Sequence, residues 1–400
     1  MGSTDTQIIR AGSVWTCDGF IDRQLVVIQG SHIAALEPWG TDLSSDWPVV
    51  DASDLMVVPG LVDLQVNGAL GHSFQQADLD YFDAAIGYHL AAGTTTILPT
   101  LITAPADLLC ASLKGLADYL AGSHPANLPG IHLEGPFLAP DKAGAHDPTA
   151  LTLPDLKVAT RFMQASGGQL KMVTLAPELP DAAAVIRMFH ESGVVVAAGH
   201  SAATFAQMKA AVSAGLSMLT HAGNASDWPH RAVGNFGFMA SEPGVVGSFL
   251  AIPELAGGII MDGFHVHPAL LAPIVRAKGR ERVILVSDAS TIAGCEPGHY
   301  SGGGLDVTVH AQGYATSGRG GGWLAGSTIT LLDALRNAVR LADVSLVDAV
   351  YMATTAPARV IGVDDLLGQI RAGFSADLLL LDDELTLHGV MARGGWISGG

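Results

Sequence analysis

Two patterns of hydrophobic and polar positions divide the chain. Between about residues 59 and 362, short apolar runs alternate with Ala-rich stretches whose apolar residues recur at i, i+3 and i+4, the period of an amphipathic helix. Eight runs of strand length occur, each followed by a helix candidate: 60–67, 94–100, 130–135, 171–178, 193–200, 217–221, 256–263 and 282–288. Eight strands that alternate with helices are typical of a (β/α)8 barrel.

The two ends of the chain lack the helical period. Residues 7–58 and 376–397 consist of short apolar runs separated by turn residues, which is typical of β-strands. We therefore expect an α/β protein with a (β/α)8 TIM-like barrel over residues 58–365. Residues 1–57 and 366–400 are expected to form a small β-sandwich domain together.

Two further features bear on the architecture. An open doubly wound sheet is the competing arrangement, but no Gly-rich phosphate-binding turn follows a strand candidate. The Gly-rich segment 299–327 precedes the last helical stretch and predicts a β-hairpin that leaves the final barrel loop. The barrel is therefore the favoured fold.

Composition and charge exclude several classes of partner. The chain has 400 residues, of which 49% are hydrophobic and 14% charged, as expected for a compact α/β enzyme. Asp and Glu outnumber Lys and Arg by 38 to 20, which gives a formal net charge of −18. The electric field of so acidic a protein repels polyanions, so we expect neither nucleic acid nor an anionic membrane surface as a partner. An anionic small substrate would need its own basic residue.

The cysteines and the N-terminus indicate a cytoplasmic protein. Cys17, Cys110 and Cys295 are far apart and follow no disulfide or metal-site spacing, so they are expected to be free thiols of a reducing compartment. The first residues contain no apolar signal core, and no apolar stretch is long enough to span a bilayer.

Polar side chains follow the strand candidates in five separate segments: Gln65 with Asn67, then Glu134, His200, His221 and Asp288. Each one alone is better explained as a hydrogen-bonded structural histidine or a helix N-cap. In a parallel barrel, however, the carboxyl ends of all strands open on the same face. Five coincident placements therefore favour a site on that face.

One Glu and two His match the ligand set of a catalytic zinc centre that keeps a position open for water. Glu134, His200 and His221 are thus candidate ligands, and their type suits Zn²⁺, Fe²⁺, Co²⁺ or Mn²⁺, with Zn²⁺ the first choice. Such an ion lowers the pKa of a bound water from about 16 toward about 7. Asp288 is positioned to accept the proton of that water and to donate it to a leaving amine.

The chain resembles the N-acetylglucosamine-6-phosphate deacetylase family of the amidohydrolase superfamily. The stretches that carry the resemblance run in the family's order from about residue 57 to 382 and include "VPGLVDLQVNG", "HLEGPFLAPDKAGAH", "GHSAAT", "THAGNAS", "DGFHVHP", "VSDAS" and "LAGSTITLLDALRN". The most specific is "HLEGPF" with His146 twelve residues after its Glu134. The segments "PGLVD" and "ADLLLLD" are shared by the wider superfamily.

The resemblance implies roles for individual residues. Glu134, His200 and His221 would bind a single divalent ion, Asp288 would be the general base and then the general acid, and His146 would stabilise the oxyanion. Gln65 and Asn67 stand where many superfamily members carry a His-x-His pair. Because amides cannot replace imidazole ligands, we expect no second metal and assign both residues to substrate binding.

The remaining substrate contacts follow from the same resemblance. Asn224 and Ala225 would hold sugar or phosphate oxygens, and Arg231 and His265 resemble the family's phosphate and sugar contacts, some of which come from a neighbouring subunit of a homodimer. In an acidic protein a phosphate needs a permanently charged fork, which favours this role for Arg231 over a surface ion pair with Asp227 or Glu242. Asp262 is interpreted as a turn acid.

Several functions remain open. The leading hypothesis is metal-dependent hydrolysis of N-acetylglucosamine 6-phosphate to glucosamine 6-phosphate and acetate. The segment "HAGNAS" and the pair Thr291–Ile292 depart from the family pattern, so N-acetylgalactosamine 6-phosphate or another N-acyl amino sugar is the alternative substrate. A barrel that binds an amino sugar without turnover is disfavoured by the complete acid and ligand set. A binuclear hydrolase similar to dihydroorotase is disfavoured by Gln65 and Asn67.

Overall fold

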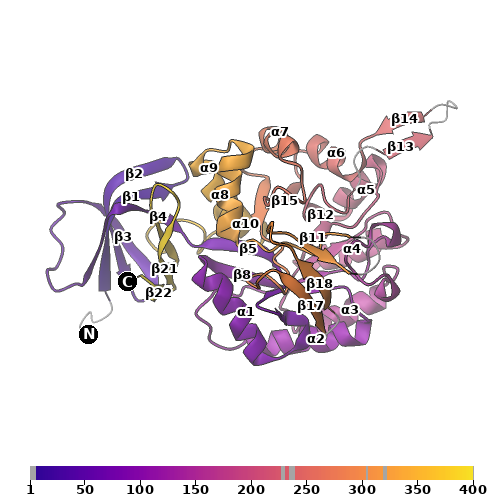
Figure 1. The fold of residues 1–400 in the computed structure, drawn as a ribbon, viewed down its shortest axis with the longest axis horizontal. Helices are drawn as coiled ribbons and strands as arrows, with labels where there is room; N and C mark the ends of the chain where they lie inside the picture. The colour runs from indigo at the N-terminus through magenta and orange to yellow at the C-terminus, as the bar shows by residue number, and fades with distance from the viewer. Residues whose placement is uncertain (1–5, 227–229, 234–238, 303–304, 319–321, 400) are drawn as a thin grey trace.

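The computed structural model describes residues 6–226, 230–233, 239–302, 305–318 and 322–399, with the backbone alone at 230–233, 239–241, 302 and 305. Its centre is an eight-stranded parallel sheet (Figure 1). In chain order these strands are β5 (Leu61–Val66), β8 (Thr94–Ile102), β9 (Ile131–Glu134), β10 (Leu170–Leu175), β11 (Val195–Ala198), β12 (Leu216–Leu219), β15 (Ala256–Ile260) and β16 (Val283–Val286). Every predicted run overlaps one of them, because strands buried on both faces are continuously apolar.

The sheet curls until its first and last strands meet. Its order is β16-β15-β12-β11-β10-β9-β8-β5, and a parallel bridge between Val66 and Ala289 joins the two outer strands at their carboxyl ends. The Asn67 N–H donates to the Ala289 carbonyl at 2.8 Å. Deeper in the barrel, buried Asp63 accepts from the backbone N–H groups of Gln65 and Ser287 at 3.2 and 3.3 Å. The predicted barrel is confirmed.

Helices cover the outside of the barrel. They are α1 (Leu79–Ala91), α2 (Ala106–Leu120), α3 (Leu156–Ala165), α4 (Ala182–Glu191), α5 (Phe205–Ala214), α6 (Gly244–Ala251), α7 (Pro268–Lys278), α8 (Leu331–Ala342), α9 (Leu346–Ala353) and α10 (Thr355–Val360). Sequence explains where some of them begin. Thr204 with Gln207, and Thr330 with Asp333, form capping boxes at the starts of α5 and α8. Within the described residues, no helix is long and apolar enough to cross a membrane.

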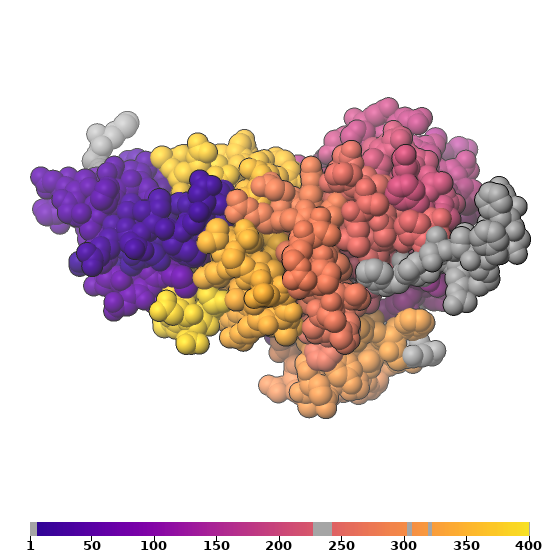
Figure 2. Space-filling model, turned by 90° about the horizontal axis from the view of Figure 1, so that it is seen from above, coloured from indigo at the N-terminus to yellow at the C-terminus, as the bar shows by residue number. Residues whose placement is uncertain are grey.

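Both chain ends build one seven-stranded sheet beside the barrel, which confirms the predicted β domain made from both termini (Figure 1). Its order is β22 (Gly395–Ser398), β21 (Leu387–Ala392), β20 (Leu378–Leu381), β4 (Val49–Pro59), β1 (Thr6–Thr16), β2 (Gly19–Gln29) and β3 (His32–Pro38). C-terminal β20 pairs antiparallel with N-terminal β4, so the indigo and yellow segments lie together in Figure 2. The domain limits 1–57 with 366–400 and 58–365 stay a prediction.

The Gly-rich segment forms more than the predicted hairpin. Three antiparallel strands, β17 (Gly298–Gly302), β18 (Leu305–Val309) and β19 (Ala315–Ser317), make an insertion that protrudes from the barrel in Figure 2. A small core of its own holds it, with Val307, Val309 and Ala315 among the buried members. Smaller elements complete the fold: β6 (Gly68–Ala69), β7 (His72–Ser73), β13 (His230–Val233), β14 (Met239–Glu242), and the 3₁₀ turns Phe74–Gln76, Pro140–Lys142 and Pro148–Ala150.

Candidate metal centre and active site

The predicted ligands come together at the carboxyl ends of three strands. Glu134 is the last residue of β9, while His200 and His221 follow β11 and β12 by two residues. Asp288 follows β16 in the same way. His200, His221 and Asp288 have φ of 49°, 28° and 47°, in the left-handed region that residues other than Gly rarely adopt. Such strained backbone is concentrated at functional sites.

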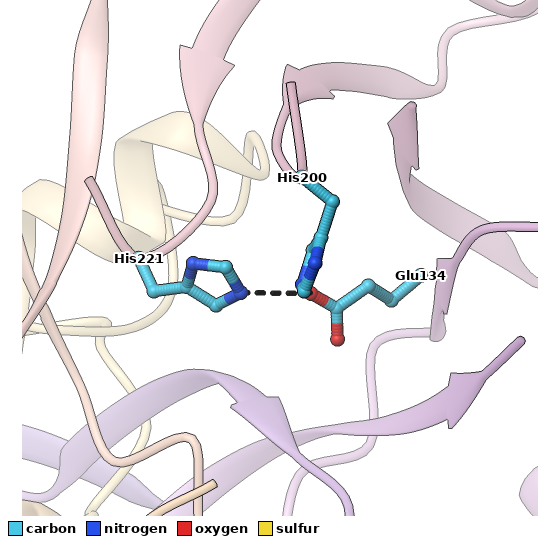
Figure 3. A group of neighbouring side chains, drawn as sticks. All are labelled: Glu134, His200 and His221. Carbon is cyan, nitrogen blue, oxygen red and sulfur yellow. Dashed lines mark hydrogen bonds and ion pairs between the residues drawn. The ribbon is translucent and has the colours of Figure 1, made fainter. Parts of the chain in front are cut away.

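The three candidate ligands point at a common centre (Figure 3). The Glu134 Oε1 atom lies 3.0 Å from His221 Nε2 and 3.3 Å from His200 Nε2. One ligand atom from each residue lies within 4.8 Å of the others, and all three residues are buried. Ligands about 2.0–2.1 Å from a tetrahedral ion lie about 3.3 Å apart, so this spacing suits one divalent cation.

The hydrogen bonds of His200 test whether the group fits a cation. Its Nδ1–H donates to the Lys142 carbonyl at 2.7 Å, so Nε2 presents a lone pair to the Glu134 carboxylate. Two lone pairs facing each other repel unless a cation lies between them. A backbone carbonyl on the far nitrogen is also the usual partner of a metal-binding histidine. The residues therefore fit a divalent metal.

The electrostatics of the ligands agree with this fit. Burial would raise the pKa of Glu134, but when protons rather than a metal ion occupy Nε2 of His200 and His221, the hydrogen bonds they donate hold that pKa well below its ordinary value. Burial opposes the charge on His221, yet Glu134 outweighs it and raises the His221 pKa to about 9. An incoming cation would therefore displace a proton from His221, as metal binding to histidine generally does.

Gln65 and Asn67 lie at the site and each supports a carboxylate. Gln65 Nε2 donates to Glu134 Oε2 at 3.2 Å, and Asn67 Nδ2 donates to Asp288 Oδ1 at 2.8 Å. Asn67 also lines the cavity over the site. Their contacts thus orient one candidate metal ligand and the candidate base, a use that the sequence did not indicate. Their assignment to substrate binding stays a prediction.

Asp288 has the environment of a general base. It is buried, and burial is the main reason why its pKa rises to about 6, with the Glu134 charge adding to the rise and His221 opposing it. A base with a pKa close to the working pH accepts a proton readily and can also return it. The Asn67 bond fixes which Asp288 oxygen stays free to do so.

His146 reaches the same centre from the loop after β9. The backbone N–H of Thr103 donates to its Nδ1 at 3.4 Å, so in the neutral ring the proton resides on Nε2. That Nε2 lies 4.0 Å from Glu134 Oε1. Burial lowers the pKa of His146 to about 3, which keeps the ring neutral. His146 thus presents a neutral N–H donor beside the candidate metal ligands.

Asp262 is more than the predicted turn acid. Its Oδ1 accepts the backbone N–H groups of Phe264 and His265, both at 2.9 Å, as a turn acid would. Its Oδ2 accepts the Nδ1–H of His265 at 2.6 Å, and both side chains are buried. His265 lines the cavity. The spacing Asp262-x-x-His265 was the sequence signal, but only the loop conformation shows that the two side chains meet.

A cavity of about 920 Å³ opens over the centre, within the size range of small-molecule sites. It is lined by Glu134, His146, His200, His221 and Asp288, and by the predicted substrate contacts Asn67, Asn224, Ala225 and His265. Among the described lining residues, Lys142 is the one Lys or Arg. The Arg231 side chain lies outside the described residues, although its backbone belongs to β13. Gln65 is buried and is not among the residues that line the cavity.

The family signature of the amidohydrolases matches residues 56–397, which include the whole barrel and the site. The chain belongs to the amidohydrolase family. The predicted resemblance is thereby confirmed, and with it the interpretation of the fold as the barrel of these hydrolases.

This amidohydrolase is similar to named deacetylases in both sequence and structure. The chain is 33% identical to N-acetylgalactosamine-6-phosphate deacetylase of Escherichia coli O157:H7, over 97% of its own length and 98% of that protein's. It is 32% identical to N-acetylglucosamine-6-phosphate deacetylase of Lysinibacillus sphaericus, over 86% of each. Among solved structures, a variant of N-acetyl-D-glucosamine-6-phosphate deacetylase from Mycobacterium smegmatis, in complex with N-acetyl-D-glucosamine-6-phosphate, superposes with a TM-score of 0.88 at 33% identity, covering 98% of this chain and 100% of that one.

Proposed function

We propose that this amidohydrolase removes the acetyl group of N-acetylglucosamine 6-phosphate, releasing glucosamine 6-phosphate and acetate. The observation that carries the proposal is the buried Glu134–His200–His221 group with Asp288 and a neutral His146 around one cavity. Relatives that share most of the chain and carry the name of this activity support it.

In this proposal each residue has a chemical task. A divalent ion held by Glu134, His200 and His221 supplies Lewis acidity that makes water acidic and polarises a carbonyl group. Asp288 accepts a proton from the attacking water and donates it to the amide nitrogen as the C–N bond breaks. His146 Nε2–H donates to the carbonyl oxygen as negative charge develops there. The products are acetate and the free amine.

In this proposal the sugar and phosphate of the substrate bind on the side of the cavity formed by the loops after β12 and β15. Asn224 and Ala225 follow β12, and His265 follows β15, so these predicted contacts share one sector of the barrel mouth. We further propose that Arg231 binds the phosphate, because the described lining carries a single Lys and several carboxylates. A cytoplasmic homodimer, in which one subunit completes the other's site, remains part of the proposal.

N-acetylgalactosamine 6-phosphate is the second candidate substrate. A relative named for that substrate is 33% identical over nearly the whole chain, an identity similar to that of the relatives named for N-acetylglucosamine 6-phosphate. The two sugars differ only at one hydroxyl group. That relative and the unusual "HAGNAS" loop both bear on the sugar end and leave the amide chemistry unchanged.

The test is a substrate panel on protein reconstituted with Zn²⁺. Acetate release would be measured with N-acetylglucosamine and N-acetylgalactosamine, each with and without the 6-phosphate. We expect the phosphorylated glucosamine derivative to have the highest kcat/KM. No acetate from any of the four would support the rival proposal of a binding protein, and two tightly held metal ions per chain would support a binuclear hydrolase.

Replacing His146 by Phe is expected to lower kcat by about 10²–10³-fold, because the oxyanion would lose its neutral N–H donor. His146→Gln is the matched control, since a Gln side-chain N–H can take the place of Nε2–H and should recover part of the rate. Steady-state kinetics on both variants checks the prediction. Equal losses in the two variants would contradict the donor role.

Replacing Asp262 by Asn is expected to raise KM about tenfold while kcat changes less than threefold. The amide keeps an oxygen for the two backbone N–H groups, but its NH₂ cannot accept the Nδ1–H of His265. His265 then loses its fixed orientation toward the cavity. Kinetics of Asp262→Asn, His265→Ala and the double variant checks this, because a residue that acts through His265 should add little to His265→Ala.

A further inference from the structure

One wall of the cavity has no task in the proposed reaction. Ile102 ends β8, and Ala104, Pro105 and Leu108 lead from that strand into the first turn of α2; all four line the cavity. Although apolar, Ile102 and Leu108 are 37% and 49% exposed. An acetyl group offers a single methyl group, which covers little of such a wall.

The order of the strands places this apolar wall across the cavity from the sugar contacts. In the closed ring β5-β8-β9-β10-β11-β12-β15-β16, four steps separate β8 from β12 in either direction, so their carboxyl ends face each other across the mouth. Asn224 and Ala225 follow β12, and His265 follows the neighbouring β15. A sugar held by these residues therefore lies opposite Ile102 and Leu108.

The catalytic groups fix how the amide lies between the two sides. Its nitrogen must face Asp288, which protonates it, and its carbonyl oxygen must face His146 Nε2. If the sugar lies on the side of β12 and β15, the alkyl part of the acyl group points toward the carboxyl end of β8. The Thr103 N–H that orients His146 belongs to this same segment, so the apolar wall begins directly beside the oxyanion donor.

We propose that this wall is an acyl-chain subsite, and that the protein hydrolyses N-acyl amino-sugar phosphates with unbranched acyl chains longer than acetyl, such as propanoyl and butanoyl. The inference rests on the proposed function and extends its substrate class. Room is available, because the cavity of about 920 Å³ extends along this wall. Each methylene that leaves water for an apolar surface improves binding by up to about fourfold.

The test compares N-acetyl, N-propanoyl, N-butanoyl and N-hexanoyl glucosamine 6-phosphate on the full-length metal-loaded protein. We expect kcat/KM for the butanoyl substrate to lie within threefold of the value for the acetyl substrate. A loss of more than 100-fold from acetyl to butanoyl would overturn the subsite while leaving the deacetylase function intact. If none of the four substrates is hydrolysed, the proposed function itself fails.

Leu108→Asp tests the wall directly. We expect the ratio of butanoyl to acetyl kcat/KM to fall at least tenfold, because a carboxylate would replace the apolar contact. Leu79→Asp is the matched control, because Leu79 is 59% exposed in the first turn of α1 and does not line the cavity. The ratio of butanoyl to acetyl kcat/KM should stay unchanged in this variant. An unchanged ratio in Leu108→Asp would overturn the proposal. So would a changed oligomeric state of that variant, because the wall would then be a contact between subunits.

Discussion

Replacing Asp288 by Asn is expected to lower kcat by about 10³-fold and to leave the metal content unchanged. The amide cannot accept the proton of the attacking water, and proton transfer by a positioned side chain contributes about 10²–10⁴-fold. Asp288 is not one of the three candidate metal ligands, so the ion should remain bound. Acetate-release kinetics and metal analysis of the same preparation would check both halves of the prediction.

The same residue sets the pH dependence. Burial raises the pKa of Asp288 from 3.8 to about 6, and the active form is the ionised carboxylate. Activity should therefore fall as the pH drops through about 6. A bound cation would lower the pKa of Asp288 and so shift this acidic limb of the pH–activity profile to lower pH. A kcat of Asp288→Asn within tenfold of the unmodified protein, or an acidic limb well above pH 6, would contradict the assignment of Asp288 as the base.

Replacing Glu134 by Gln is the second change from which we expect a large effect, on both metal content and activity. We expect less than a tenth of the metal of the unmodified protein and an activity at least 10³-fold lower, because the carboxylate that faces both imidazoles loses its charge. Chelation of the unmodified protein should have the same effect, reversed by Zn²⁺. Metal analysis by mass spectrometry, paired with acetate release, measures both.

Glu178→Gln provides the matched control for Glu134. Glu178 follows β10, accepts from the Ser201 hydroxyl and the Ala202 N–H at 2.7 and 2.6 Å, and is not a member of the ligand group. This variant should keep its metal. Full activity after exhaustive chelation, or equal metal loss in the two variants, would rule out Glu134 as a ligand.

The sequence predicted the barrel because its strands are buried on both faces and therefore read as separate apolar runs. It predicted that Glu134, His200 and His221 come together, because they lie at the ends of such runs and parallel strands end on one face. Neither argument depends on loop conformation. The terminal sheet was predicted for a similar reason, since its strands carry turn residues at both ends.

Other features could not be predicted, because they depend on how loops and side chains orient. The proton positions of His146 and His200 follow from backbone partners, Thr103 and Lys142, that lie far from them in sequence. The use of Gln65 and Asn67 to support carboxylates depends on atoms that only folding brings together. In the insertion, frequent Gly residues interrupt the alternation of apolar and polar positions, so the sequence pattern did not predict the third strand.

The pairing of β20 with β4 constrains the order in which the protein can be finished during synthesis. Val57 and Val58 leave the ribosome early, but their partners Leu380 and Leu379 are made about 320 residues later. Until then, the nascent chain exposes an unpaired apolar strand edge, a known route to aggregation. A chain that ends before β20 should therefore leave this edge of β4 permanently unpaired.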